Sequence, residues 1–265
     1  MDFKQLFKDI KSFNIKSLKL RLYKLKVILK RSLLVPFRIN YANHKNIKKI
    51  PIIINNRNRI TYLLRLIEWL EKNGYNNIYI IDNNSTYPPL LKFYESTKYT
   101  VFHLNDNVGY LALWKTGIIK QFQHNYYVYT DSDIVPIEEC PSNFMEFFIM
   151  KLSKYKGIEK IGFGLKIDDL PEHYADKQKV LDWENKFWEK EVEENIFDAD
   201  LDTTFALYKP YSNRIIWEQK ALRTGGKYIA QHLPWYEDSK NDSEETLFYK
   251  KTIRKDSSHW IEGEK

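Results

Sequence analysis

The residues with the clearest chemical capability are Asp131 and Asp133, two carboxylates that stand two positions apart. They follow residues 126–130, an aromatic and β-branched run typical of a buried strand. Two aspartates at the end of a strand can both turn towards one divalent cation, and Mn²⁺ and Mg²⁺ prefer such oxygen ligands. A cation bound there neutralises the charge that develops when a diphosphate leaves. The pair therefore predicts a Mn²⁺ or Mg²⁺ site that handles a phosphorylated substrate.

Spacing alone does not identify this site, because Asp198, Asp200 and Asp202 repeat the same Asp-x-Asp pattern. A solvated turn is the alternative interpretation for either run. The apolar residues on both sides of the pair at 131 and 133 favour the metal site there.

Polar clusters also follow two other expected strands, at 51–54 and 77–81. Open α/β sheets place their ligands at the carboxyl ends of the strands, so three such clusters at one edge indicate a binding site. The residues expected to contact a ligand from these two clusters are Asn55, Arg57, Asp82 and Asn84.

Strand-like and helix-like runs alternate through the chain after residue 50, which is typical of an α/β fold with a mostly parallel sheet flanked by helices. The helix expected at 60–72 has an apolar face and stops at Asn73 and Gly74. Further strands are expected at 99–103, 126–130, 161–164 and 203–208, and further helices at 89–96, 110–121 and 178–195.

Composition excludes several classes of protein. With 15% aromatic residues the 265-residue chain is too apolar for a disordered protein, and its single Cys140 excludes a disulfide scaffold. No run approaches the ~18 to 20 apolar residues that span a bilayer. We therefore expect a cytoplasmic protein.

Charge is concentrated at the start of the chain, where residues 1–50 carry 14 Lys and Arg but only two Asp. Because the whole chain has a net charge of +7, residues 51–265 are mildly acidic. A nucleic-acid-binding protein needs basic groups over its folded surface, so no nucleic-acid partner is expected.

The basic arm, residues 1–46, has a helical apolar stripe with Lys and Arg between its members. A basic amphipathic helix suits an anionic membrane surface, which predicts peripheral contact through residues 1–33. The alternatives are a helix packed on its own domain and, for residues 18–22, a strand. The apolar stripe consists of Ile15, Leu18, Leu22, Leu25, Leu29 and Leu33.

Residues 52–136 resemble the nucleotide-binding half of the inverting glycosyltransferases of family 2, which have the GT-A fold. The motifs that carry the resemblance are Ile53-Ile-Asn-Asn-Arg-Asn-Arg59, Ile80-Ile-Asp-Asn-Asn-Ser-Thr86, Asn105-Asp-Asn-Val-Gly109 and Asp131-Ser-Asp133. The resemblance implies that Asp82 contacts the base, that Asn55, Arg57 and Asn107 lie near the nucleotide, and that Asp131 and Asp133 serve ribose and metal. Two departures stand out: Asn55-Asn56 replaces the usual Thr/Ser-Tyr/Phe, and residues 111–114 are bulkier than the usual Ala-x-Asn.

The second half resembles the family only in outline. GT-A enzymes often complete the metal site with a late histidine, so His232 is a candidate ligand, although a lone histidine is more often structural. Arg223 and Lys227 are candidates for holding phosphates. The aromatic run within 178–195 is either core packing or a lid over an acceptor.

An inverting transfer needs a carboxylate within hydrogen-bond reach of the acceptor hydroxyl. Glu244 and Glu245 have the order of the family's Glu-Asp pair, whereas Asp200 and Asp202 should face the donor sugar. The base therefore stays divided between these two pairs. Ser243 offers a further alternative, since it could cap a helix whose first turn prefers Glu.

Together these features predict a catalytic domain at 47–265, with a nucleotide-sugar-binding half at 47–136 and an acceptor-binding half at 137–265. The predicted activity is metal-dependent transfer of a sugar from a UDP-sugar to a glycan or lipid-linked acceptor, in bacterial surface polysaccharide synthesis. A sugar-nucleotide nucleotidyltransferase is the alternative. Its Gly-rich phosphate loop has no counterpart here, because no Gly precedes Gly74.

Overall fold

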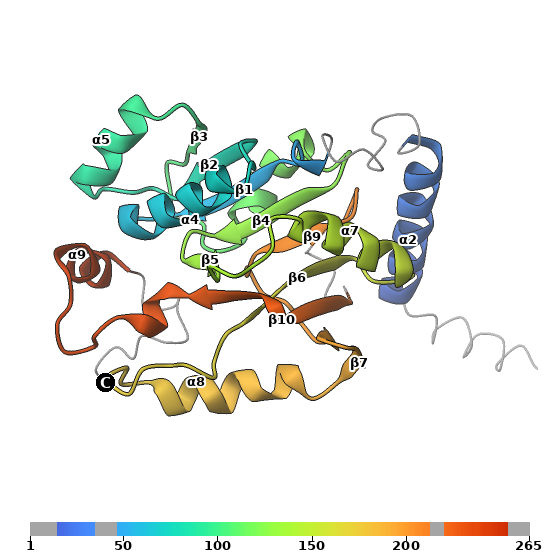
Figure 1. The fold of residues 1–265 in the computed structure, drawn as a ribbon. Helices are drawn as coiled ribbons and strands as arrows, with labels where there is room; N and C mark the ends of the chain where they lie inside the picture. Colours follow the sequence, from blue (N-terminus) through green and yellow to red (C-terminus); the bar gives the residue numbers. More distant parts are fainter. Residues whose placement is uncertain (1–14, 35–46, 213–219, 254–265) are drawn as a thin grey trace, which may run out of the picture.

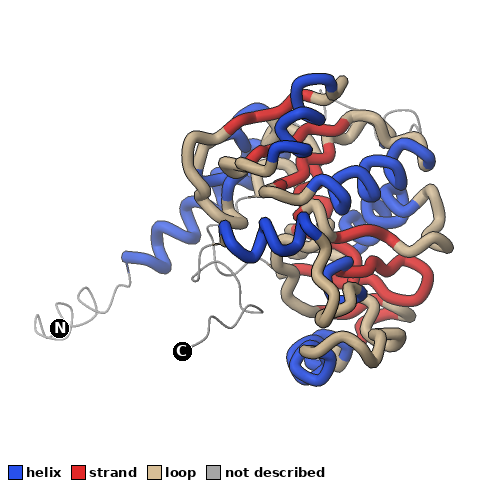
Figure 2. Tube along the Cα trace, turned by 90° about the vertical axis from the view of Figure 1, so that its left-hand side faces the viewer, coloured by secondary structure: helices blue, strands red, loops and turns tan. Residues whose placement is uncertain are grey.

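The computed structural model describes residues 15–34, 47–212 and 220–253 of the chain. One mixed sheet crosses the domain, helices pack on its faces, and helix α2 (Ile15–Leu34) lies at one side (Figures 1 and 2). Within the described residues, no helix combines the length and the apolar content needed to cross a membrane.

The sheet confirms the predicted α/β class with a mostly parallel arrangement. Its order is β3-β2-β1-β4-β9-β6-β10-β8-β7, and β5 pairs with β10. From β3 to β10 every strand runs in the same direction except β9, which lies antiparallel between β4 and β6. The strands are β1 (Ile52–Asn56), β2 (Ile78–Asp82), β3 (Thr100–His103), β4 (Tyr127–Asp131), β5 (Ile134–Pro136), β6 (Lys160–Leu165), β7 (Glu191–Glu193), β8 (Ile196–Asp198), β9 (Ala206–Tyr208) and β10 (Ala221–His232).

The strands read as continuous apolar runs because both faces of the sheet are buried. Ile52 and Ile54 face one core, together with Leu63 of helix α4 (Ile60–Lys72). The intervening Ile53 faces a second core with Trp114 of the short helix α6 (Ala112–Lys115). The remaining helices are α5 (Pro88–Ser96), α7 (Phe144–Lys154), α8 (Lys177–Glu184) and α9 (Glu244–Thr252), with 3₁₀ turns at Ile118–Gln121, Asn185–Trp188 and Leu233–Tyr236.

Two of the expected helices are shorter than predicted. The one expected at 110–121 is divided by Gly117, whose φ of +76° is left-handed and ends α6. The one expected at 178–195 ends at residue 188, and Glu191–Glu193 is strand β7 instead. The helix expected at 60–72 is confirmed at both ends.

Helix α2 confirms the helical interpretation of the arm and excludes the strand at 18–22. The helix does pack on the domain, because Arg31 forms an ion pair with Glu159 at 2.6 Å and Val27 is buried. The four members of the apolar stripe whose side chains are described do not make this contact, since Leu22, Leu25, Leu29 and Leu33 are all exposed.

Candidate active site

The three predicted polar clusters meet at one edge of the sheet. β1 lies between β2 and β4, all parallel, so their carboxyl ends are neighbours. Asn55 is in register with Asp131, and its Nδ2 donates to the Asp131 Oδ1 at 3.1 Å. Asn56 is in register with Asp82. Parallel pairing thus brings together side chains that lie far apart in the sequence.

Asp131 and Asp133 differ in their electrostatic surroundings. Burial raises the pKa of Asp131, and the neighbouring Asp133 raises it further, against hydrogen bonds from Thr203 and Asn55. Burial also acts to raise the pKa of Asp133, but His232 and Arg59 outweigh it and lower that pKa. Asp133 is therefore the carboxylate that the site holds in its charged form.

His232 reaches Asp133 through the antiparallel pairing of β10 with β5. The backbone N–H of Leu233 donates to the carbonyl of Asp133 at 2.9 Å, and His232 Nε2 lies 3.4 Å from Asp133 Oδ2. The Nδ1 of His232 is buried and has no hydrogen-bond partner among the described residues. The ring packs against Trp235, with centroids 4.6 Å apart. These contacts place His232, the predicted metal ligand, beside Asp133.

The donor set fits a hard cation only in part. A carboxylate oxygen and an imidazole nitrogen 3.4 Å apart can share one cation, and Mg²⁺ commonly takes one or two carboxylates plus phosphates and water. Asp131 is already engaged by Asn55 and Thr203. Across the described parts of the chain, no three His, Cys, Asp or Glu side chains converge on one point. The candidate metal ligands are therefore Asp133 and His232, with Asp131 beside them.

A buried arginine near Asp133 is a feature that the sequence analysis missed. Arg59 Nη1 donates to Thr246 Oγ1 at 2.7 Å, and its guanidinium lies over the rings of Tyr62 and Tyr249, 4.9 and 4.2 Å from the centroids. Arg59 also lowers the pKa of Asp133, so its positive charge acts on the carboxylate pair. Arg59 lies in the polar cluster that follows the first strand, but only Asn55 and Arg57 of that cluster are predicted there as ligand contacts.

Glu237 is the second feature that was missed. Thr246 Oγ1 lies 3.1 Å from its Oε2, which places it beside Arg59. Burial raises the pKa of Tyr62 against the effect of Arg59, and both Glu237 and Asp133 raise it further, so Tyr62 lies near both carboxylates. A Glu-Asp pair, the order sought at 244–245, stands at 237–238 and was the available signal.

Glu245 has a structural role at the start of α4. Its carboxylate accepts from the Thr61 backbone N–H at 3.2 Å and from the Thr61 hydroxyl at 2.5 Å, which caps the first turn of α4. Glu244 is exposed at the start of α9. Ser243 accepts from the Thr246 N–H at 3.1 Å and is the N-cap of α9, as the alternative interpretation proposed.

Asp200 and Asp202 lie exposed in the segment between β8 and β9. This segment borders the site, because Thr203 donates to Asp131 and Asp202 raises the pKa of Asp131. The backbone carbonyl of Asp200 instead accepts from Arg223 Nε at 2.7 Å. Of the two aspartates, Asp202 therefore lies towards the carboxylate pair.

Arg223, a predicted phosphate contact, is buried away from the strand ends. Its Nη1 donates to Glu184 at 2.7 Å, and the guanidinium lies 3.8 Å from the Phe187 ring centroid. Both side chains of this ion pair are almost inaccessible to solvent. Arg223 thus ties α8 to β10, which supports the core-packing interpretation for Phe187, whereas Trp183 of the same aromatic run is 50% exposed. Lys227 is exposed.

On the nucleotide side, Asp82 is nearly buried. Its Oδ1 accepts from the Ser85 N–H at 3.1 Å, and its Oδ2 lies 3.1 Å from His103 Nδ1. Asn84 is exposed with a left-handed φ of +60°. The buried neighbour Asn83 holds the 105–109 loop instead, accepting from the Val108 N–H at 2.8 Å.

The 105–109 loop is fixed at Gly109. Asn83 Nδ2 donates to the carbonyl of Gly109 at 3.0 Å, and Asn107 Oδ1 accepts from the N–H of Gly109 at the same distance. Gly109 has a φ of +76°, which L side chains rarely adopt. The loop is therefore held by Asn83, the residue that follows Asp82.

Arg57 is held by α9. Its Nη2 donates to the carbonyl of Thr252 at 2.6 Å, and Asn58 Nδ2 donates to the Thr252 hydroxyl at 2.9 Å. The Nε and Nη1 of Arg57 are buried and have no hydrogen-bond partner within the described residues. Two buried cationic donors at the site make Arg57 a suitable group for an anionic ligand.

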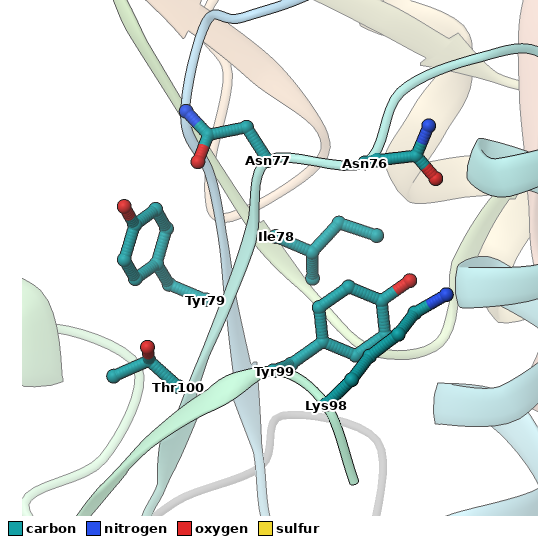
Figure 3. A pocket seen from close by; sticks show the side chains of 7 residues that line it. All are labelled: Asn76, Asn77, Ile78, Tyr79, Lys98, Tyr99 and Thr100. Atoms are coloured by element: carbon teal, nitrogen blue, oxygen red, sulfur yellow. The ribbon is translucent and has the colours of Figure 1, made fainter.

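A shallow hollow lies at the opposite edge of the sheet, where β2 and β3 begin (Figure 3). Lys98 lies alongside the ring of Tyr99, and the rest of the lining is Asn76, Asn77, Ile78, Tyr79 and Thr100. Its lining contains no carboxylate or histidine, in contrast to the carboxyl edge with Asp131, Asp133 and His232.

No protein-family model matches the chain, and no curated protein matches it. Among solved structures it is similar to S. aureus TarS, with 16% identity and a TM-score of 0.43, over 69% of this chain and 36% of TarS. It is similar to GalNAc-T7, solved with UDP, GalNAc and Mn²⁺, with 11% identity and a TM-score of 0.44, over 69% of this chain and 43% of GalNAc-T7. It is also similar to a cytidylyltransferase from Leptospira borgpetersenii, with 14% identity and a TM-score of 0.33, over 46% of this chain and 56% of that enzyme.

Proposed function

We propose that this protein is a glycosyltransferase of the GT-A type, which transfers a sugar from a nucleotide-diphosphate donor to an acceptor hydroxyl. The observation that carries the proposal is the position of Asp133 at the carboxyl edge, between His232 and the buried Arg59. One metal-binding carboxylate beside a buried cation suits a substrate that carries two phosphates.

The donor is a UDP-sugar in this proposal. Asp82 and the Asn83-held loop at 105–109 form one wall at the end of β2, where the resemblance expects the base. Asn55 and Asp131 lie next to them, where the ribose is expected. Arg57, with two buried donors left over, is placed to meet a phosphate.

Asp133 and His232 are the residues that would hold Mn²⁺ or Mg²⁺, with Asp131 adjacent. The cation supplies neutralisation of the charge that develops on the departing diphosphate. The protein's own contribution to the same charge is Arg59, which is fixed by Thr246 and by two aromatic rings.

Glu237 is the carboxylate that we assign as the base, with Asp202 as the second candidate. Glu237 lies beside Thr246 and Arg59 and acts on the pKa of Tyr62 together with Asp133, so it borders the reacting region. In the reaction the acceptor oxygen bonds to the anomeric carbon, the bond from that carbon to the diphosphate breaks, and the carboxylate takes the hydroxyl proton. Attack opposite the leaving group gives inversion, as the resemblance implies.

The proposed acceptor is a glycan or a lipid-linked molecule. The proposed pathway is the assembly of a bacterial surface polysaccharide, in the cytoplasm. The loop after β1 does not support the nucleotidyltransferase alternative, which would need a Gly-rich phosphate-binding loop there. The loop after β1 contains no glycine and instead uses Asn58 at a φ of +52°.

A thermal-shift titration tests the donor site. Wild-type protein is titrated with UDP, GDP, CDP and ATP, each with and without Mn²⁺, beside Asp133→Asn and the matched surface control Asp182→Asn. We expect UDP with Mn²⁺ to raise the midpoint in wild type and control but not in Asp133→Asn, because a ligand of the native state stabilises it. A preference for a nucleoside triphosphate would point to the nucleotidyltransferase, and no response to any nucleotide would overturn the proposal.

A further inference from the structure

Helix α2 contacts the domain through one narrow face. Arg31 pairs with Glu159 and donates to the carbonyl of Pro210 at 2.7 Å, and the Tyr23 hydroxyl donates to the carbonyl of Tyr211 at 3.3 Å. Val27 lies between these two residues on the same face and is 8% exposed. Steps of four residues return to one side of a helix, so Tyr23, Val27 and Arg31 share this face, with the apolar Val27 between two polar contacts.

The opposite face of α2 is the apolar one. Leu22, Leu25, Leu29 and Leu33 are spaced by three and four residues and are 57 to 64% exposed, and Ile28 beside them is 56% exposed. Five large apolar side chains exposed on one short helix form a continuous patch, which is typical of an interaction surface. In Figure 1 the helix stands at the side of the domain, with described contacts only on its inner face.

The charge around this patch has one sign. The sequence of α2 contains seven Lys and Arg and no Asp or Glu. Lys26 is exposed and flanks the leucines on one side, whereas Lys30, also exposed, has its Nζ 5.1 Å from the ring centroid of Tyr211 at the docking side. A partner that covers this face must accept apolar side chains in its centre and cations at its border.

We propose that the outward face of α2 binds an anionic phospholipid bilayer. Leu22, Leu25, Leu29 and Leu33 would insert at the boundary between headgroups and acyl chains, while Lys26 remains at the phosphate level. A second copy of this helix would be repelled by the same basic border, whereas anionic headgroups are attracted to it. Binding is therefore peripheral and depends on the lipid charge. This proposal is independent of the reaction that the domain catalyses.

The docking contacts also orient the domain. Glu159 precedes β6, and Pro210 follows β9, so α2 lies at the amino edge of the parallel strands. The Asp131 and Asp133 site is at the carboxyl edge, and α9, which borders it, stands on the other side of the domain from α2 (Figure 1). A domain bound through α2 would hold its candidate active site away from the bilayer surface.

Vesicle flotation with the full-length protein tests the proposal. Vesicles of phosphatidylcholine alone are compared with vesicles that contain about one third phosphatidylglycerol. We expect wild type to float with the anionic vesicles only. Leu25→Ser/Leu29→Ser should reduce the bound fraction at least about tenfold, and Lys26→Gln should reduce it about fivefold. The matched control Leu64→Ser/Leu91→Ser removes two exposed leucines from α4 and α5 and should bind like wild type.

Three results would overturn the proposal. Wild type could remain unbound with both vesicles, or Leu25→Ser/Leu29→Ser could bind as well as wild type. Sedimentation analysis could also show a dimer that this double variant dissociates and vesicles do not, which would make the face a contact between copies. Circular dichroism and the thermal midpoint of each variant verify that α2 and the domain remain folded.

Discussion

Glu245 of α9 accepts hydrogen bonds from both the backbone N–H and the hydroxyl of Thr61 in the first turn of α4. A carboxylate at this position satisfies an otherwise unpaired N–H and interacts favourably with the positive end of the helix dipole. The same contact fastens α9 over the turn that follows β1. Glu245 is therefore a clamp between two helices, and the acidic chemistry of the site depends on other carboxylates.

Glu245→Ala should consequently destabilise the protein. The loss of the carboxylate that caps α4 should lower the free energy of unfolding by about 1–2 kcal/mol. Urea unfolding followed by circular dichroism measures this change, with the exposed Glu244→Ala as the matched control. Equal stability of the two variants would show that the contact to Thr61 contributes nothing.

Glu237→Gln, in contrast, should lower the catalytic activity. If Glu237 takes the acceptor proton, its amide cannot, and kcat should fall about 10²- to 10⁴-fold while nucleotide binding persists. The comparison is with Asp202→Asn, the other candidate base, and with Glu244→Gln as the control. A fall in kcat for Asp202→Asn alone would transfer the role to Asp202.

The sequence predicted the elements of the first half well because each depends on local pattern. Helix 60–72 and the strands around Asn55, Asp82 and Asp131 are bounded by apolar runs and turn residues, and parallel pairing then joins them without further information. Gly117 was a readable signal for the division of the helix expected at 110–121.

Other features could not be read from local pattern. Glu237 reaches Arg59 only through Thr246 of α9, a contact between three segments far apart in the chain. Arg223 is a residue type suited to binding phosphate, and only its burial against Glu184 shows a packing role. The periodicity of α2 predicted a helix with one apolar face, but not that the other face would dock.

His232→Ala should raise the Mn²⁺ concentration required for the UDP-dependent thermal shift. The loss of one of two protein ligands weakens the binding of Mn²⁺, although Asp133 remains. We therefore expect at least a tenfold increase in the half-saturating Mn²⁺ concentration. His124→Ala, which alters a histidine that contacts Tyr211 instead, is the matched control. An unchanged Mn²⁺ requirement would leave His232 as a packing partner of Trp235.

The Arg31–Glu159 pair predicts a dependence of stability on pH. Burial alone raises the pKa of Glu159, but Arg31 outweighs it and the pKa is lowered overall. A carboxyl whose pKa is lower in the folded state contributes stability above its unfolded pKa of about 4.3, and this contribution is lost as the pH falls through the folded value. Arg31→Met should therefore cost about 1–2 kcal/mol near pH 7 and progressively less below pH 4. Urea unfolding of both proteins across this range measures the difference, and a constant difference would contradict the pairing.

Arg223 and Glu184 offer a test of packing against ligand binding. Removing one partner of a buried ion pair leaves an uncompensated charge, so Arg223→Met should destabilise the protein by about 3–5 kcal/mol. Replacing both partners, Arg223→Met/Glu184→Leu, should recover most of that loss, because an apolar pair fits the surroundings provided by Phe187. If Arg223 instead held a donor phosphate, the double variant would regain stability and still fail to bind UDP. We expect UDP binding by the double variant to equal that of wild type, measured by calorimetric titration in the presence of Mn²⁺.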